Sequence, residues 1–121
     1  MIKRKEEMKT RIATNVFGGK GDLAFLDILE KEESLGMTRI FSLLTLKEGQ
    51  SIGPHTHKGE VEIYYILKGE VEALDQGEWI KMYPGDVAFT RNEVEHGVRN
   101  PNAEDAELLA VIIEEGRCLT S

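Results

Sequence analysis

From Met37 onward the chain consists of short segments rich in Ile, Val, Tyr, Phe and Thr, separated at close spacing by turn-forming residues. Branched and aromatic residues favour strands, and no helical periodicity of useful length occurs in this part of the sequence. The pattern predicts an all-β fold, an antiparallel sandwich or barrel. The expected strands are 38–46, 51–57, 62–67, 70–74, 78–82, 87–90, 96–99 and 108–113.

The first 36 residues follow no such pattern, and residues 1–22 are expected to form an irregular N-terminal arm. The glycine-rich run 18–21 lacks the spacing of a phosphate-binding loop, so a turn before a short strand at 23–29 is the better interpretation. Residues 28–33 could form a short helix. The basic residues of the arm are interrupted by two glutamates and are expected to be solvated; they are Lys3, Arg4, Lys5, Lys9 and Arg11.

Length and charge limit the possible classes of protein. A chain of 121 residues fits a single domain, here taken as residues 1–121. The net charge of −7 argues against nucleic acid as a partner. The longest purely apolar run, 108–113, is far too short to span a membrane, and the N-terminus does not resemble a secretory signal. Cys118 is the only cysteine, so no intramolecular disulfide can form. A cytoplasmic protein is expected.

The three histidines of the chain are placed where a metal site would need them. In an extended strand, His55 and His57 would leave the same face with Cα atoms about 6.6 Å apart. Their imidazoles could then converge on one ion at roughly 2.0–2.1 Å from each nitrogen. A carboxylate from the next strand, Glu62 or Glu60, and His96 from a later segment would complete the site.

These residues belong to a longer pattern of fixed spacing. Gly49, His55, His57, Glu62 and Gly69 match the first signature of the cupin superfamily position for position. In the second signature, Gly85, His96 and Asn100 stand at the expected offsets, while Arg91 and Glu93 replace the usual proline and glycine. Residues 37–113 therefore resemble a small, single-domain bacterial or archaeal cupin.

The resemblance implies a double-stranded β-helix, or jelly-roll barrel, with one metal ion held by His55, His57, Glu62 and His96. It favours Glu62 over Glu60, which becomes a residue of the rim. Three imidazoles and one carboxylate leave about two open positions on an octahedral ion. This ligand set suits divalent Mn, Fe, Co, Ni or Cu, with Zn as a further possibility.

Three further residues are candidates for binding a substrate. Arg91 would stand at the barrel mouth, where a guanidinium could clamp an anion. Arg39 is either an edge residue or a charge inside the barrel. Tyr64 shares the parity of Glu62 and is expected to line the pocket, whereas Tyr65 points to the other side. Because both faces of this strand are apolar, the outer face predicts a homodimer.

Two classes of function are consistent with these features. The first is a metalloenzyme acting on a small carboxylate or a sugar-like substrate, by oxidoreductase, decarboxylase or isomerase chemistry. The second is a non-catalytic module that binds or senses a small ligand. Cupins include both classes, so the fold does not choose between them.

Overall fold

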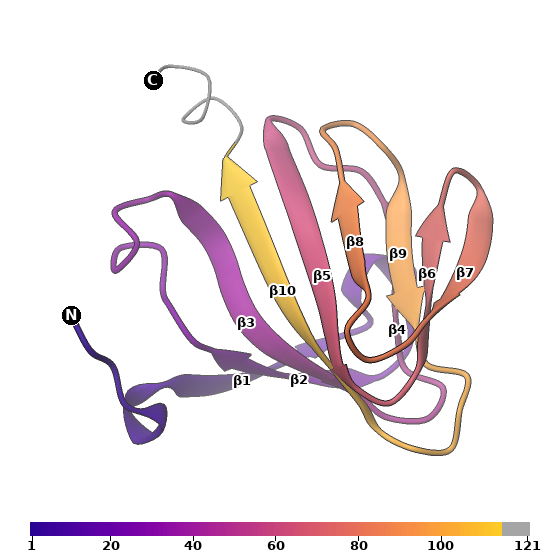
Figure 1. The fold of residues 1–121 in the computed structure, drawn as a ribbon, viewed down its shortest axis with the longest axis horizontal. Coiled ribbons are helices and arrows are strands. Elements are labelled where there is room, and N and C mark those ends of the chain that lie inside the picture. Colours follow the sequence, from indigo (N-terminus) through magenta and orange to yellow (C-terminus); the bar gives the residue numbers. More distant parts are fainter. Residues whose placement is uncertain (115–121) are drawn as a thin grey trace.

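The computed structural model describes residues 1–114 and consists almost entirely of antiparallel strands in two sheets (Figure 1). Two short 3-10 helices, η1 (Lys5–Glu7) and η2 (Val16–Gly18), lie in the N-terminal part. The strands are β1 (Lys9–Thr14), β2 (Asp22–Asp27), β3 (Thr38–Leu46), β4 (Ser51–His55), β5 (Glu60–Lys68), β6 (Val71–Asp75), β7 (Glu78–Met82), β8 (Val87–Thr90), β9 (His96–Arg99) and β10 (Ala106–Glu114).

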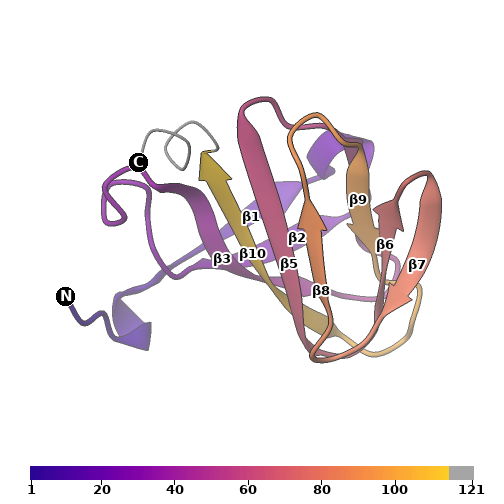
Figure 2. The ribbon, with the colours of Figure 1, turned by 45° about the horizontal axis from the view of Figure 1, so that its top comes forward.

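The sheets face each other as the two halves of a jelly-roll barrel, which confirms the predicted fold class. The larger sheet has the strand order β1-β2-β3-β10-β5-β8, and the smaller has the order β4-β9-β6-β7. Figure 2 shows the larger sheet curving from the N-terminal strands to β8, with the smaller sheet beside it. Among residues 1–114 no helix is long and apolar enough to span a membrane.

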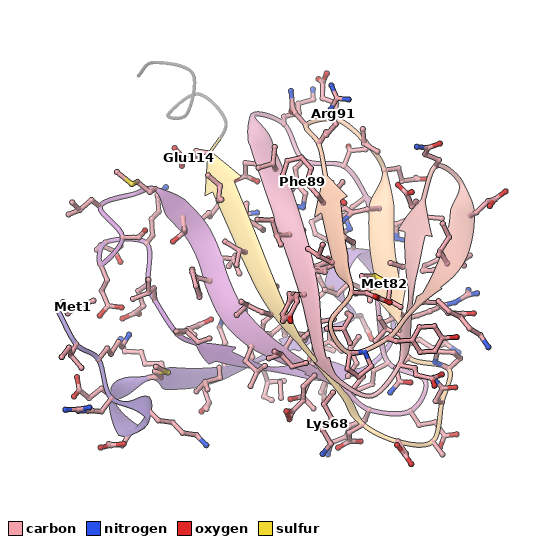
Figure 3. The ribbon with its side chains drawn as sticks, viewed as in Figure 1. Met1, Lys68, Met82, Phe89, Arg91 and Glu114 are labelled. Atoms are coloured by element: carbon pink, nitrogen blue, oxygen red, sulfur yellow. The ribbon has the colours of Figure 1, made fainter. Side chains whose placement is uncertain are left out.

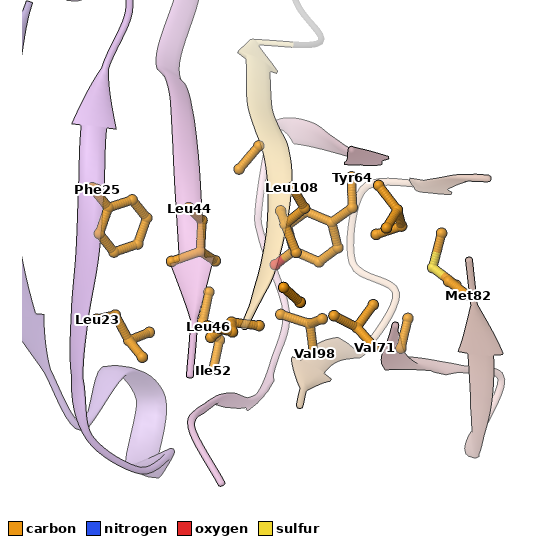
Figure 4. Packing of buried hydrophobic residues seen from close by; sticks show 14 residues of the cluster. Leu23, Phe25, Leu44, Leu46, Ile52, Tyr64, Val71, Met82, Val98 and Leu108 are labelled. Atoms are coloured by element: carbon orange, nitrogen blue, oxygen red, sulfur yellow. The ribbon is translucent and has the colours of Figure 1, made fainter. Parts of the chain in front are cut away.

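A core of apolar side chains fills the space between the sheets (Figure 4). Period-2 alternation places one face of each strand inside, so Leu44 and Leu46 of β3 are fully buried, as is Leu108 of β10. The same alternation on β5 buries Glu62 and Tyr64 and leaves Tyr65 exposed, as the parity of the sequence predicted.

The N-terminal segment is more ordered than the sequence indicated. Strand β1 pairs with β2 in antiparallel register, and the two form a hairpin that extends the larger sheet. Three of the basic residues expected to be solvated have acidic partners: Lys9 Nζ lies 3.4 Å from Glu30 Oε1, and the other two are Lys3 and Arg11. Lys3 Nζ lies 2.6 Å from Glu33 Oε1, and Arg11 Nε donates to both carboxylate oxygens of Asp27.

Two other expectations were wrong in detail. Residues 28–33 do not form the expected helix. The amides of Ile28 and Leu29 both donate to the Phe41 carbonyl of β3, and residues 31–33 belong to a turn that ends at Leu35 and Gly36 with positive φ angles. Strand β4 ends at His55 rather than His57. Its neighbour β9 begins at His96, which is paired with His55, so the chain beyond His55 has no strand to pair with on this side.

Candidate metal centre

Side chains from both sheets meet at one end of the core. His55 on β4 and His96 on β9 are cross-strand partners in the smaller sheet. Glu62 comes from β5 of the larger sheet, and His57 lies in the loop between β4 and β5. One ligand atom from each of these four residues lies within 4.8 Å of the others, an arrangement that could hold a metal ion.

The contacts within the cluster join nitrogen and oxygen atoms that can all act as ligands. His57 Nε2 lies 3.2 Å from His55 Nε2 and 3.0 Å from Glu62 Oε1. His96 Nε2 is also 3.0 Å from Glu62 Oε1. All four side chains are buried, with exposed fractions of 9% or less. A divalent cation could accept electron pairs from one atom of each of the four residues at once.

The outer nitrogens of two imidazoles are oriented by neighbouring acceptors. His55 Nδ1 donates to the carbonyl oxygen of Gly53 at 2.7 Å, which leaves Nε2 without a proton in the neutral ring. His57 Nδ1 lies 3.2 Å from Glu60 Oε1. Metal-binding histidines typically give their second nitrogen to a carbonyl or carboxylate in this way. Glu60 therefore belongs to the rim, and Glu62 faces the cluster.

His96 differs from the other two histidines. Within the described part of the chain, neither ring nitrogen of His96 has a partner in hydrogen-bond geometry, although both nitrogens are buried. Its ring is stacked on that of Tyr64, with centroids 5.3 Å apart. A buried Nε2 that points to a carboxylate without forming an aligned hydrogen bond fits a metal ligand better than a structural histidine. The donor set thus suits a divalent transition metal.

Without a metal, the neighbours of each group set its protonation. Burial lowers the pKa of His55, whereas the hydrogen bond to Glu62 raises the pKa of His57. Burial of Glu62 favours its neutral form, but the contacts with His57 and His96 outweigh this effect and lower its pKa. Burial, together with the Glu62 charge, raises the pKa of Tyr64 well above its usual value, so Tyr64 remains a neutral phenol.

A cavity of about 160 Å³ lies against the cluster. His55, His57 and Glu62 line it on one side, and Tyr64 forms part of its wall. Two arginines, Arg11 from β1 and Arg39 from β3, line the same cavity; the remaining lining residues are Ala13, Val16, Phe17, Phe25, Ile40, Ile52, Ala110 and Ile112. We call this space the site cavity.

The substrate-binding candidates have different positions around this cavity. Arg39 and Tyr64 line it, and the Tyr64 hydroxyl is buried without a hydrogen-bond partner among residues 1–114. Arg39 donates to Glu60 from Nε at 2.6 Å and from Nη2 at 3.2 Å. The structure does not bring Arg91 to the site cavity. Arg91 is exposed after β8, at the edge of the molecule (Figure 3).

The turn after Arg91 keeps the geometry that the site needs despite its two unusual residues. Glu93 has a φ of 65°, the left-handed conformation that glycine adopts readily. Its amide donates to the carbonyl of His57 at 2.8 Å, and Asn92 Oδ1 accepts from the amide of Gly59 at 2.7 Å. The turn therefore fixes the loop that carries His57.

Sequence reasoning missed Arg11 and Phe17, which both come from the N-terminal hairpin. Phe17 is stacked on the His55 ring with centroids 4.0 Å apart and planes 8° from parallel. Arg11 lies over the ring of Phe25 at 4.2 Å. The sequence offers no clear signal for strand β1, because its one large apolar residue, Ile12, is exposed, while Arg11 and Ala13 face the cavity.

Comparisons with known proteins agree with this architecture. A family model for the cupin domain matches residues 42–112. A curated Thermotoga maritima protein named "Oxalate-binding protein" is 40% identical over 113 residues, which is 93% of each chain. A crystal structure from the same species, of a "predicted oxalate decarboxylase", is similar with a TM-score of 0.88 at 39% identity, covering 94% of this chain and 99% of that chain. The crystal structure of TT1209 from Thermus thermophilus has a TM-score of 0.71 at 29% identity, covering 93% of this chain and 96% of that chain.

Proposed function

The chain belongs to the cupin family, and from this premise we propose that it is a metal-dependent binding protein for a small dicarboxylate of the size of oxalate. The observation that carries the proposal is the site cavity, where His55, His57 and Glu62 of the four-residue cluster lie beside two arginines. His55, His57, Glu62 and His96 would hold one divalent ion. That ion would supply Lewis-acid attraction for the oxygens of an anionic ligand.

The two arginines complement the negative charge of such a ligand. Arg11 uses only its Nε for the bonds to Asp27, and Arg39 uses Nε and Nη2 for Glu60. Each guanidinium has five N–H donors, so several remain for a carboxylate. The partner acids hold the guanidinium groups in place at the cavity wall. A similar protein bears the name "Oxalate-binding protein", which supports the same class of ligand.

The size of the cavity argues for a small ligand. Its volume of about 160 Å³ is below the 300–1,000 Å³ typical of sites for drug-sized molecules. Apolar side chains such as Ile40 and Ile112 form much of its wall, so the polar contacts are concentrated at the cluster and the arginines. A compact dianion satisfies these conditions, whereas a sugar would leave many hydroxyl groups facing apolar walls.

A second candidate function is conversion of the bound carboxylate by the same site. Tyr64 is the observation in its favour, because its neutral hydroxyl is buried at the cavity without a hydrogen-bond partner in the described chain. Such a hydroxyl can donate a hydrogen bond, or a proton, to a ligand. Glu62 is the sole carboxylate among the described residues that line the cavity. With no second carboxyl group to act as acid or base, binding is favoured over catalysis.

Calorimetric titration of the metal-loaded protein tests the proposed function. Elemental analysis first identifies the ion in the purified protein and its stoichiometry. Oxalate should then bind to the loaded protein and fail to bind after chelation of the metal, and acetamide, a neutral molecule of similar size, should not bind. Equal binding of oxalate with and without metal would contradict the proposal. Incubation with oxalate, followed by assays for carbon dioxide and formate, tests the second candidate.

We also propose that the outer face of the larger sheet is the contact surface of a homodimer. Two rows of apolar side chains cross this face in register. The first consists of Phe89, Ile63, Val111 and Phe41, and the second of Val87, Tyr65, Leu109, Leu43 and Leu26. We call these two rows the outer rows. Three members are exposed, namely Phe89 at 58%, Val87 at 61% and Tyr65 at 40%, whereas Val111 is buried. The exposed members lie side by side on β5 and β8, and an exposed apolar patch of this kind favours association.

A further inference from the structure

Part of the site cavity is built by a segment that precedes the residues matched by the family model. The family model matches residues 42–112, whereas β1, η2 and β2 form a hairpin at residues 9–27. Five residues that line the cavity come from this hairpin: Arg11, Ala13, Val16, Phe17 and Phe25. The cupin signatures supply the metal cluster, and the hairpin supplies part of the wall that a ligand would meet.

Phe17 is the hairpin residue in closest relation to the cluster. Its ring lies face to face with the His55 imidazole, although 58% of the side chain is exposed. Its backbone has φ 50° and ψ 40°, a left-handed conformation that is unfavourable for a bulky residue. Strained conformations of this kind persist only where surrounding contacts enforce them, and they concentrate at functional sites.

The contacts that enforce it join the hairpin to β4. A Cβ atom on Gly53 would lie 2.1 Å from the carbonyl oxygen of Phe17, and one on Gly19 would lie 2.2 Å from the carbonyl oxygen of Ser51. Only glycine permits so close an approach of the two backbones. Two hydrogen bonds of 3.0 Å, from the Ser51 amide to the Lys20 carbonyl and from the Lys20 amide to Ser51 Oγ, complete the junction.

The junction acts on His55 from two directions. The Gly53 carbonyl accepts a hydrogen bond from His55 Nδ1. The backbone of Gly53 is also in close contact with the carbonyl of Phe17. The Phe17 ring covers one face of the same imidazole. Displacement of the hairpin would therefore remove the ring from the His55 imidazole and the backbone contact beside Gly53.

We propose that Phe17 is a positioning and specificity-determining residue of the metal centre. Its ring fixes the orientation of His55, and its place in the wall of the site cavity limits the length of the ligand. The second role rests on the proposed binding of a small dicarboxylate; the first does not. The ring narrows a cavity of about 160 Å³, so its removal would enlarge the space available to a longer ligand.

The test uses the full-length protein loaded with Co²⁺, whose visible absorption reports ligand geometry. Phe17→Ala should alter the Co²⁺ spectrum and weaken Co²⁺ binding by about tenfold, the lower end for loss of a group that orients a metal ligand. Phe17→Trp should restore both, because indole can stack on imidazole. Phe17→Gly removes the ring and also the backbone strain, so it should behave as Phe17→Ala does. Tyr83→Ala, at a similarly exposed aromatic residue, should leave the spectrum unchanged.

Titration of the Co²⁺ protein with oxalate and malonate tests the specificity role. The wild type should bind oxalate more tightly than malonate. Phe17→Ala should reduce the ratio of the two affinities roughly tenfold, the order expected for one methylene group. A wild-type spectrum and affinity for Co²⁺ in Phe17→Ala would overturn the positioning role. An unchanged preference would overturn the specificity role. If the wild type binds Co²⁺ and neither dicarboxylate, the proposed function and the specificity role both fail, and the spectrum alone decides the positioning role.

Discussion

The carboxylate of Glu60 lies 3.2 Å from His57 Nδ1, on the side of the imidazole opposite the Nε2 atom that contacts Glu62. Arg39 holds Glu60 in this position with two hydrogen bonds. A carboxylate at Nδ1 fixes the tautomer that leaves Nε2 free for a metal and increases the basicity of the ring. Arg39, which lines the site cavity, is thus linked through one carboxylate to a metal-ligand candidate.

The first prediction concerns this carboxylate. Glu60→Gln should reduce metal affinity by about 10- to 100-fold, because the amide cannot support the His57 ring as an ionised acceptor does. Competition against a chelator of known affinity measures the change. The matched control is Glu72→Gln, which removes a carboxylate that also accepts from an arginine, Arg99, on the other sheet. Equal losses in the two variants would contradict a specific role for Glu60.

The second prediction is that the metal stabilises the fold. An ion that binds only the folded state at about 100 times its Kd contributes about 2.7 kcal/mol to the free energy of unfolding. Chelation should therefore lower the melting temperature of the wild type, and addition of Mn²⁺, Fe²⁺, Ni²⁺ or Zn²⁺ should restore it. His57→Ala should respond much less. The metal-site assignment fails if the purified protein lacks stoichiometric metal and both proteins melt alike with each ion.

The third prediction separates the arginines. Under saturating metal, Arg11→Gln and Arg39→Gln should each weaken oxalate binding by about 1.5–3 kcal/mol, the usual value of a hydrogen bond to a charged group. Arg91→Gln should leave the affinity unchanged, because the exposed Arg91 does not line the site cavity. Calorimetry on the three variants measures the differences. If only Arg91→Gln lost oxalate affinity, Arg91 and not Arg11 or Arg39 would be the residue that binds the anion.

The fold and the cluster could be predicted because their signals are local. Period-2 alternation and turn residues define the strands from Thr38 onward, and fixed spacing brings three histidines and Glu62 together. The direction of a side chain in a turn has no such signal. Spacing along the chain put Arg91 five residues before His96, but only the folded turn shows it exposed.

The N-terminal hairpin could not be predicted because its determinants are distant in sequence. Strand β1 contains only two apolar residues, Ile12 and Ala13, and Ile12 is 63% exposed. What holds β1 in place is its register with β2 and the bonds from Arg11 to Asp27, 16 residues away. The approach of this hairpin to β4 depends on Gly19, in an expected turn, and Gly53, in an expected strand, and neither position indicates in the sequence that two backbones meet there.

The fourth prediction tests the dimer. Tyr65→Glu places a charge within the outer rows, on a strand flanked by apolar neighbours on both sides. Light scattering at micromolar concentration should give a dimer mass for the wild type and a monomer mass for this variant, because burial of an unpaired charge is costly. Ile80→Glu, at a residue of similar exposure on β7 of the other sheet, should remain dimeric. A monomeric wild type would refute the proposal.

The final prediction concerns pH. In the metal-free protein, His57 should titrate above about 6.5 and His55 below it, because Glu62 stabilises the charged form of His57 and burial disfavours that of His55. Since a raised pKa means that folding favours the protonated ring, the contribution of His57 to the stability of the metal-free protein is present at low pH and is lost as pH rises through the pKa of His57.

The metal affinity should depend on pH in the opposite direction, because a metal binds the neutral ring. It should fall about tenfold for each pH unit below the pKa of His57. Resonances of the imidazole C–H groups, followed by NMR, report both midpoints, and Glu62→Gln should shift the midpoint of His57 downward. Coincident midpoints for His55 and His57 in the wild type would show that the contact with Glu62 does not control the charge of His57.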